Sequence, residues 1–138
     1  MVEVAINYLA VLAATISSII IGFLWYGPLF GKTWMRLMNF NKKKIKESKN
    51  KGMTKSYFFM SLSSLVTSYV LAHFVDYVGA TTISAGLQLS FWLWVGFFAT
   101  TMLSSILWEE RPVKLYLINV LHYLVSFAVM TTILVLWV

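Results

Sequence analysis

Four long apolar runs constrain this chain more than any other feature. They cover residues 5–26, 57–78, 83–108 and 115–137, and Asp76 is the one charged residue within them. As a helix, each run is long enough to cross the roughly 30 Å hydrocarbon core of a bilayer. At 59% hydrophobic residues, the chain has more apolar surface than one small water-soluble core can bury. The sequence predicts an all-α fold, with residues 1–138 forming a single four-transmembrane-helix bundle.

The positions of the lysines and arginines predict the orientation. All 11 lie outside the apolar runs, nine of them between Lys32 and Lys55 and the other two at Arg111 and Lys114. Cytoplasmic loops carry an excess of these residues. We therefore expect a multi-pass membrane protein, with the first and third loops in the cytoplasm and both termini outside. The start of the chain lacks the basic residues of a signal peptide, so the first run is expected to stay as a span.

An aromatic segment containing a proline follows the first run. Trp25 and Tyr26 are ring types enriched at headgroup depth. Gly27-Pro28 is expected to break the helix, because proline lacks an N–H and disfavours helical geometry in the residue before it. Beyond this break, an apolar face at helical spacing predicts a short interfacial helix, with an irregular loop as the alternative. That face consists of Phe30, Trp34, Leu37 and Met38.

Residues 41–55 form a lysine-rich loop. It has one acidic residue, Glu47, and no apolar pattern. Anionic headgroups would attract such a loop by about 1 kcal/mol per nearby charge. We expect Trp34, Lys42, Lys43 and Lys44 to contact the lipid interface. No aromatic residue lies between the lysines, and this argues against a nucleic-acid partner despite the net charge of +6.

Small residues recur at helical spacing in the second and third runs. Such stripes let helices in a membrane approach closely, so we expect packing seams or subunit interfaces there. The second run has Ser61, Ser64, Ser68 and Ala72, and the third has Gly86 and Ser90 followed by Gly96, Thr100 and Ser104.

Two ordered segments resemble the signatures of a known family. Residues 7–12 and 24–35 resemble the opening signature of the small bacterial membrane proteins catalogued as domain-of-unknown-function family 1761. Residues 108–112, together with Leu115, Ile118, Asn119 and Tyr123, resemble its second signature. The resemblance covers nearly the whole chain and is weakest in the lysine-rich loop. It implies a four-helix bacterial inner-membrane protein and brings no activity.

Polar residues gather toward the cytoplasmic ends of the first, third and fourth runs. Polar side chains are costly at membrane depth, so they are expected to face the bundle and pair, as an Arg111–Glu109 or a Glu–His122 pair would. Such a group could bind a polar headgroup or small ligand, or pass protons, or it could simply hold the helix ends together. Its members are Trp25, Tyr26, Glu109, Glu110, Arg111, Asn119, His122 and Tyr123.

A second polar group, Tyr69, His73 and Asp76, lies near the outer end of the second run. Asp76 follows His73 by three residues and is expected to accept its imidazole N–H. The pair reads either as a proton relay or as a structural hydrogen bond. No spacing of ligand residues indicates a zinc site, and no cofactor is expected.

The function is left open between two classes. We see no phosphate loop, nucleophile elbow or zinc-protease motif, so an enzyme is the less favoured class. One hypothesis is a homo-oligomer that binds or passes a small solute or ion of unknown identity. The alternative is a structural or accessory membrane protein that binds lipid or a partner membrane protein without transport or catalysis. One structural feature would distinguish the two hypotheses: whether Glu109, Asn119 and His122 line a cavity or are packed between helices.

Overall fold

All regular structure in the described part of the chain is helical. The computed structural model describes residues 4, 6–37 and 54–137 of the 138. In chain order the elements are α1 (Tyr8–Leu24), a π-helical turn (Trp25–Leu29), α2 (Gly31–Leu37), α4 (Thr54–Tyr77), α5 (Ile83–Trp94), a second π-helical turn (Val95–Ala99), a 3-10 turn (Thr101–Leu103), α6 (Ser104–Leu107) and α7 (Val113–Leu136). The predicted all-α class is confirmed.

Four of the described helical stretches are long and apolar enough to cross a membrane. They run over Tyr8–Leu29, Thr54–Tyr77, Ile83–Leu107 and Val113–Leu136. Each overlaps one of the four apolar runs of the sequence. The chain is therefore a multi-pass membrane protein with the predicted four helices.

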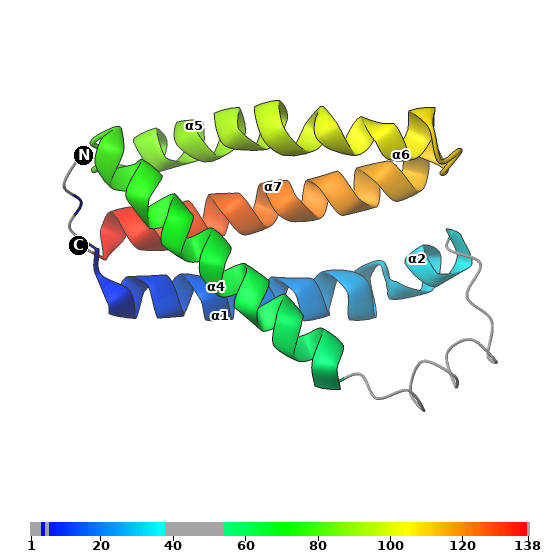
Figure 1. Ribbon diagram of the computed structural model, residues 1–138, viewed down its shortest axis with the longest axis horizontal. Helices are drawn as coiled ribbons and strands as arrows, with labels where there is room; N and C mark the ends of the chain where they lie inside the picture. Colours follow the sequence, from blue (N-terminus) through cyan, green and yellow to red (C-terminus); the bar gives the residue numbers. More distant parts are fainter. Residues whose placement is uncertain (1–3, 5, 38–53, 138) are drawn as a thin grey trace.

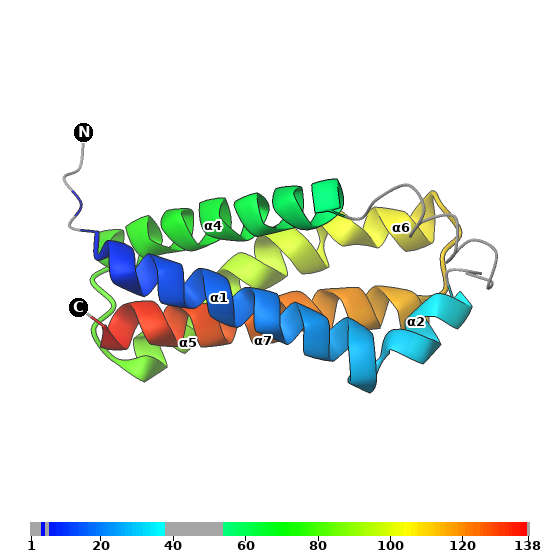
Figure 2. The same cartoon turned by 90° about the horizontal axis from the view of Figure 1, so that it is seen from below.

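Helix α7 is the central helix of the bundle. It contacts α1, α4 and α5, and α4 also packs on α1. In Figure 1, α1, α7 and α5 lie side by side along the long axis while α4 crosses them diagonally. Figure 2 shows both termini and the α4–α5 turn at one end, which we call the terminal end. The helices α2 and α6 lie at the other end, which we call the elbow end.

The close-packed core lies toward the terminal end. Small residues of α1 and α4 let these two helices approach α7 closely, because alanine adds little to the helix radius. Around them, larger residues fill the space between the three helices. The core comprises Ala10, Val11, Ala14, Leu71, Ala72, Val75, Ala80, Phe127, Met130, Leu134 and Val135.

Toward the elbow end, α4 leaves the bundle. Residues 54–60 are all exposed, although Tyr57 keeps a ring contact with Phe23 of α1 at 5.9 Å between centroids.

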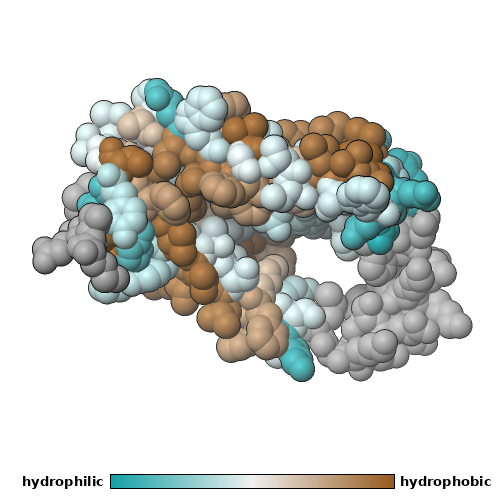
Figure 3. Space-filling model, turned by 45° about the horizontal axis from the view of Figure 1, so that its top comes forward, coloured by the Kyte–Doolittle hydropathy of each residue, from teal (hydrophilic) through white to brown (hydrophobic). Residues whose placement is uncertain are grey.

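Apolar side chains cover much of the middle of the molecule in Figure 3, and hydrophilic ones gather toward its ends. This pattern is the one expected of helices that face lipid along their length.

The two small-residue groups of the third span have different surroundings. Gly86 and Ser90 are buried, and a Cβ added at Gly86 would lie 3.0 Å from Val135 Cγ2 of α7. Gly96 is exposed, and a Cβ there would meet nothing within 4 Å. Among the described residues, the first group is therefore a packing seam against α7, whereas the Gly96 face has no neighbour in a single copy. The two groups differ because Gly96 lies two residues beyond Trp94. Two residues turn a helix by about 200°, so Gly96 lies on the face of the span opposite to Trp94.

Ser68 offers a direct test of the core. Its side chain is fully buried in α4, and its Oγ has no hydrogen-bond partner in the described structure. Because a buried hydroxyl without a partner carries a penalty, we expect Ser68→Ala to raise the free energy of unfolding by about 1 kcal/mol. Denaturation in a mixed-detergent titration measures this change.

Ser90→Ala is the matched control for Ser68→Ala. Ser90 is equally buried, but its Oγ donates to the Leu87 carbonyl at 2.9 Å. Removal of that bond is expected to lower stability by about 0.6 kcal/mol, the mean for polar contacts in membrane helices. Equal losses for the two variants would show that Ser68 has a partner after all.

Candidate functional site

A π-helical turn joins the first span to α2. The N–H of Phe30 donates to the Trp25 carbonyl at 2.9 Å, a bond that spans five residues instead of four. Pro28 lies inside this turn, so Gly27-Pro28 does not end the helix as expected. In an α-helix, proline has no N–H to donate to the carbonyl four residues earlier. The wider π-helical turn accommodates the proline because this four-residue hydrogen-bond pattern is relaxed there.

The predicted short helix is confirmed as α2, and its first residue packs closely against the turn that precedes it. Gly31 is the reason that it can do so, because a Cβ at this position would lie 2.6 Å from the Tyr26 carbonyl oxygen. Ring contacts then fix the bend: Trp34 lies against Tyr26 at 5.8 Å, and Phe30 against Trp25 at 4.8 Å. Residues 25–37 are called the elbow below. Met38, the last residue of the predicted face, lies outside the described residues.

Aromatic side chains hydrogen-bond to α7 in the half of the bundle nearest the elbow end. From the elbow, Trp25 donates its indole N–H to the Ile118 carbonyl at 2.9 Å, and Tyr26 donates its hydroxyl to Asn119 Oδ1 at 2.7 Å. From α5, the Trp94 indole N–H donates to the Val120 carbonyl at 2.6 Å. These three bonds meet within one turn of α7 and tie the first and third spans to it.

Two residues of this arrangement are missed by the sequence reasoning. Trp94 is one, and Tyr116 of α7, whose hydroxyl bonds the Ala99 carbonyl, is the other. The signal for Trp94 is its place in the middle of a span, where an indole N–H needs an acceptor. The sequence does not show that carbonyl oxygens of α7 and of the second π-helical turn serve as the acceptors.

His122 lies among the same rings. Its centroid is 5.1 Å from that of Tyr26, 5.0 Å from Tyr123 and 6.1 Å from Trp25. Its Nε2 faces Ser126 Oγ at 3.4 Å, while its Nδ1 is buried without a hydrogen-bond partner in the described structure. The expected Glu–His122 pair is therefore absent among the described residues.

Tyr123 completes the predicted inner group by packing. Its ring stacks on Phe98 of the second π-helical turn, with centroids 4.7 Å apart. Phe98 in turn lies edge-on to Phe127 at 4.9 Å. Tyr123 thus joins the aromatic packing between the third and fourth spans.

The charged members of the predicted inner group lie apart from His122, in the turn between α6 and α7. The turn is held by the Arg111 backbone N–H, which donates to the Ser105 carbonyl at 2.9 Å, and Glu110 takes a left-handed φ of 54°. Glu109, Glu110 and Arg111 line an open cavity of about 590 Å³ at the elbow end, together with residues at the end of α2. Its lining residues are Arg36, Leu37, Glu109, Glu110, Arg111 and Pro112.

The outer group differs from its predicted geometry. His73 Nδ1 faces the Tyr69 backbone carbonyl at 2.8 Å, and its ring lies 4.6 Å from that of Tyr69. The expected hydrogen bond to Asp76 is absent among the described contacts, because the carbonyl one helical turn earlier occupies Nδ1. Asp76 instead lines a cavity of about 310 Å³ at the terminal end.

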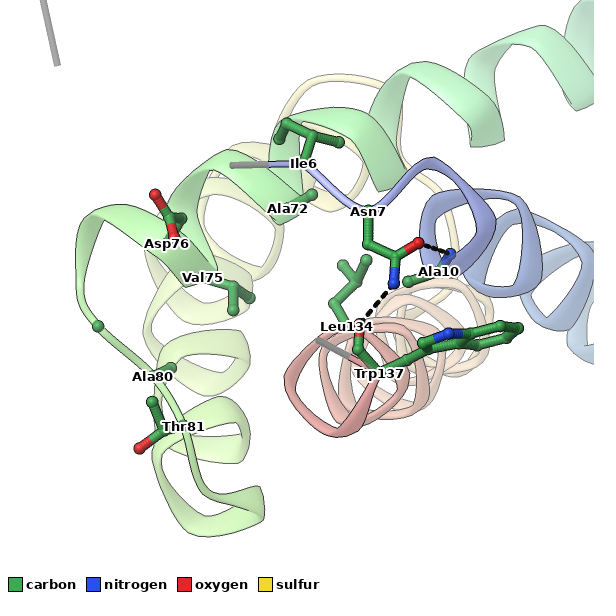
Figure 4. A pocket seen from close by; sticks show the side chains of 11 residues that line it. Ile6, Asn7, Ala10, Ala72, Val75, Asp76, Ala80, Thr81, Leu134 and Trp137 are labelled. Atoms are coloured by element: carbon green, nitrogen blue, oxygen red, sulfur yellow. Dashed lines mark hydrogen bonds between the residues drawn. The ribbon is translucent and has the colours of Figure 1, made fainter. Parts of the chain in front are cut away.

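The terminal-end cavity is mainly apolar. In Figure 4, Asn7 bridges α1 and α7: its side chain donates to the Trp137 carbonyl at 3.3 Å and accepts from the Ala10 N–H. The amide of Asn7 is therefore used to cap α1 and to hold the end of α7. Asp76 and Thr81 lie at the other side of the cavity, toward the α4–α5 turn (Figure 4).

Two further grooves flank α4 and are almost entirely apolar. One, of about 490 Å³, separates α4 from α1 and is lined by Tyr8, Val11, Leu12, Leu65, Val66 and Tyr69. The other, of about 220 Å³, separates α4 from the third span and α7, and Phe74, Phe97 and Phe127 are among its lining residues. The diagonal crossing of α4 opens these grooves.

Metal ligands do not cluster in the part of the chain that the structure describes. No three His, Asp or Glu side chains come close enough to hold an ion there. Of the predicted lipid-interface residues, Trp34 lies in the elbow, whereas Lys42, Lys43 and Lys44 fall outside the described residues.

Comparison with known proteins supports the resemblance seen in the sequence. The family model described as "Protein of unknown function (DUF1761)" matches residues 9–135. No curated protein and no solved structure matches the chain.

Proposed function

We propose that this chain, which belongs to the family described as "Protein of unknown function (DUF1761)", binds membrane lipid at its elbow end and catalyses no reaction. One observation carries the proposal. The polar groups in the elbow half of the bundle bond one helix to another, whereas the charged groups line a cavity at the helix ends. This is the arrangement of a protein that holds its helices firmly and presents polar chemistry at headgroup level.

Hydrogen bonding within the bundle argues against a solute path through this half of a single copy. The Trp25, Trp94 and Tyr26 donors are all occupied by α7. Asn119 accepts a hydrogen bond from Tyr26, His122 lies among aromatic rings, and neither residue lines any of the cavities described above. Breaking these bonds to admit a solute would leave polar groups unpaired at membrane depth, which costs several kcal/mol each.

The distribution of charge supports a cytoplasmic elbow end. The described cations, Lys32, Arg36, Lys55, Arg111 and Lys114, all belong to segments at or next to this end. With the lysine-rich loop, they would attract anionic headgroups of an inner membrane, while both termini face outside. The apolar grooves beside α4 would then accept acyl chains.

Lipid retention tests the proposal. After purification in a mild detergent, native mass spectrometry of the full chain should find phospholipid bound at a defined copy number, because the charged cavity at the elbow end would hold its headgroup. In proteoliposomes the same protein should give no flux of protons, potassium or small solutes above empty vesicles. A chain that carries no phospholipid would refute the proposal.

A homo-oligomer that passes a solute or ion is the second candidate. The unpartnered, buried Nδ1 of His122 favours it, since such an atom in the described structure could face a water or ion in a larger assembly. The exposed face at Gly96 would supply a subunit contact. Flux that disappears in His122→Gln, with an oligomer in the mass spectrum, would establish this reading instead.

A further inference from the structure

The cavity at the elbow end contains charges of both signs. Arg36 comes from α2, and Glu109, Glu110 and Arg111 come from the turn before α7. The side chains of Arg36, Glu109 and Glu110 have no hydrogen bond or ion pair in the described structure. Its volume of about 590 Å³ lies within the usual range for small-molecule sites.

The position of the cavity suits a lipid headgroup. It lies where α2 ends beside the turn that joins the third and fourth spans, beyond the apolar part of both. The elbow rings Tyr26 and Trp34 pack together just before it in the chain. Residues of this kind lie at headgroup depth, so the cavity opens where phosphates and their substituents are found.

The two kinds of charge select among headgroups. Guanidinium groups bind phosphate, which is the role that Arg36 can fill here. An anionic headgroup without a cation would bring its phosphate close to the like charges of Glu109 and Glu110 and offer these carboxylates no donor. A quaternary ammonium is recognised by aromatic rings, and the described lining of this cavity has none. A primary ammonium instead offers three N–H donors, which carboxylates accept.

We infer that this cavity binds a phospholipid headgroup that carries both a phosphate and a primary ammonium group, as phosphatidylethanolamine does. Arg36 holds the phosphate and the two glutamates hold the ammonium. The inference rests on the proposed lipid-binding function and adds a headgroup preference to it.

Competition between lipids tests the preference. The full chain is stripped of lipid in detergent and given an equimolar mixture of phosphatidylethanolamine, phosphatidylcholine and phosphatidylglycerol with identical acyl chains. Native mass spectrometry should show phosphatidylethanolamine bound about fivefold more often than either of the others. This preference is smaller than the one that a full charge-assisted hydrogen bond would produce. Equal occupancy by the three lipids would overturn the inference and leave lipid binding itself intact.

Variants locate the preference in the cavity. Glu109→Gln with Glu110→Gln should bring the phosphatidylethanolamine preference to about onefold, because neutral amides hold an ammonium weakly. Arg36→Gln should lower the occupancy of all three lipids. Asp76→Asn at the terminal end removes a single negative charge outside this cavity and should leave the preference unchanged.

Two outcomes with the variants would refute the site. One is an unchanged preference in the double glutamate variant, and the other is an equal loss in the Asp76→Asn control. Failure of any phospholipid to bind would refute the proposed function as well, so the two failures are distinguishable. Circular dichroism of each variant confirms that the helices are intact.

Discussion

Gly31→Ala is expected to displace α2 from the first span. The added Cβ would lie 2.6 Å from the Tyr26 carbonyl oxygen and 3.2 Å from its carbonyl carbon. Both atoms belong to the backbone of the π-helical turn, so no side-chain rotation relieves the clash. Overpacking of this kind costs roughly 1–3 kcal/mol, and here the bend between the turn and α2 must open to relieve it.

Spin labels would report the displacement. The chain has no cysteine, so Lys32→Cys on α2 and Leu117→Cys on α7, both exposed, give a single labelled pair. In Gly31→Ala the distance distribution between the labels should shift by several ångströms or broaden. Lipid copy number in the mass spectrum should fall with it, because the displacement moves Arg36 away from the charged turn.

Gly22→Ala, in the last turn of α1, is the matched control. A Cβ at Gly22 would come no closer than 3.7 Å to His122 Nε2, which is an ordinary van der Waals contact. Its distance distribution should match that of the parent chain. A narrow, unshifted distribution in Gly31→Ala would mean that α2 does not pack against the turn at Gly31 as described.

The helices were predictable from the sequence because their signals are local and strong. Each apolar run is too long for a strand of a small sheet and carries almost no charge, which leaves a membrane helix as its stable form. The helix of the elbow was predictable in the same way, from the spacing of Phe30, Trp34 and Leu37. Its π-helical entry was not, because Gly27-Pro28 is compatible with both a break and a widened turn.

The composition of the polar group depended on geometry that the sequence does not contain. Trp25, Tyr26, Asn119 and His122 do come together, since they share a level on neighbouring spans. Glu109 and Glu110 were expected with them, but the turn before α7 places them in a separate cavity beside Arg36. The partner of His73 likewise depends on which acceptor its ring reaches, and a backbone carbonyl competes with Asp76 there.

The largest loss of stability is expected for Gly86→Leu. Gly86 is where α5 approaches α7 most closely among the described glycines of that span: an added Cβ would lie 3.0 Å from Val135 Cγ2 and 3.5 Å from the Thr131 carbonyl oxygen. A leucine adds three more carbons to this space. Of the described spans, only α7 makes extensive contact with α5, so the wedge has no second neighbour to hold α5 in place. The free energy of unfolding in a mixed-detergent titration should fall by about 3 kcal/mol.

Gly96→Leu distinguishes the effect of packing against α7 from the effect of adding a leucine to this span. It makes the same substitution ten positions further along the same span, where a Cβ would meet nothing within 4 Å. For a single copy, its unfolding curve should match that of the parent chain. Equal losses at Gly86 and Gly96 would show that the cost comes from leucine in this helix rather than from contact with α7. Loss at Gly96 together with a reduced copy number in the mass spectrum would instead identify this face as a contact between copies, and would strengthen the oligomeric alternative.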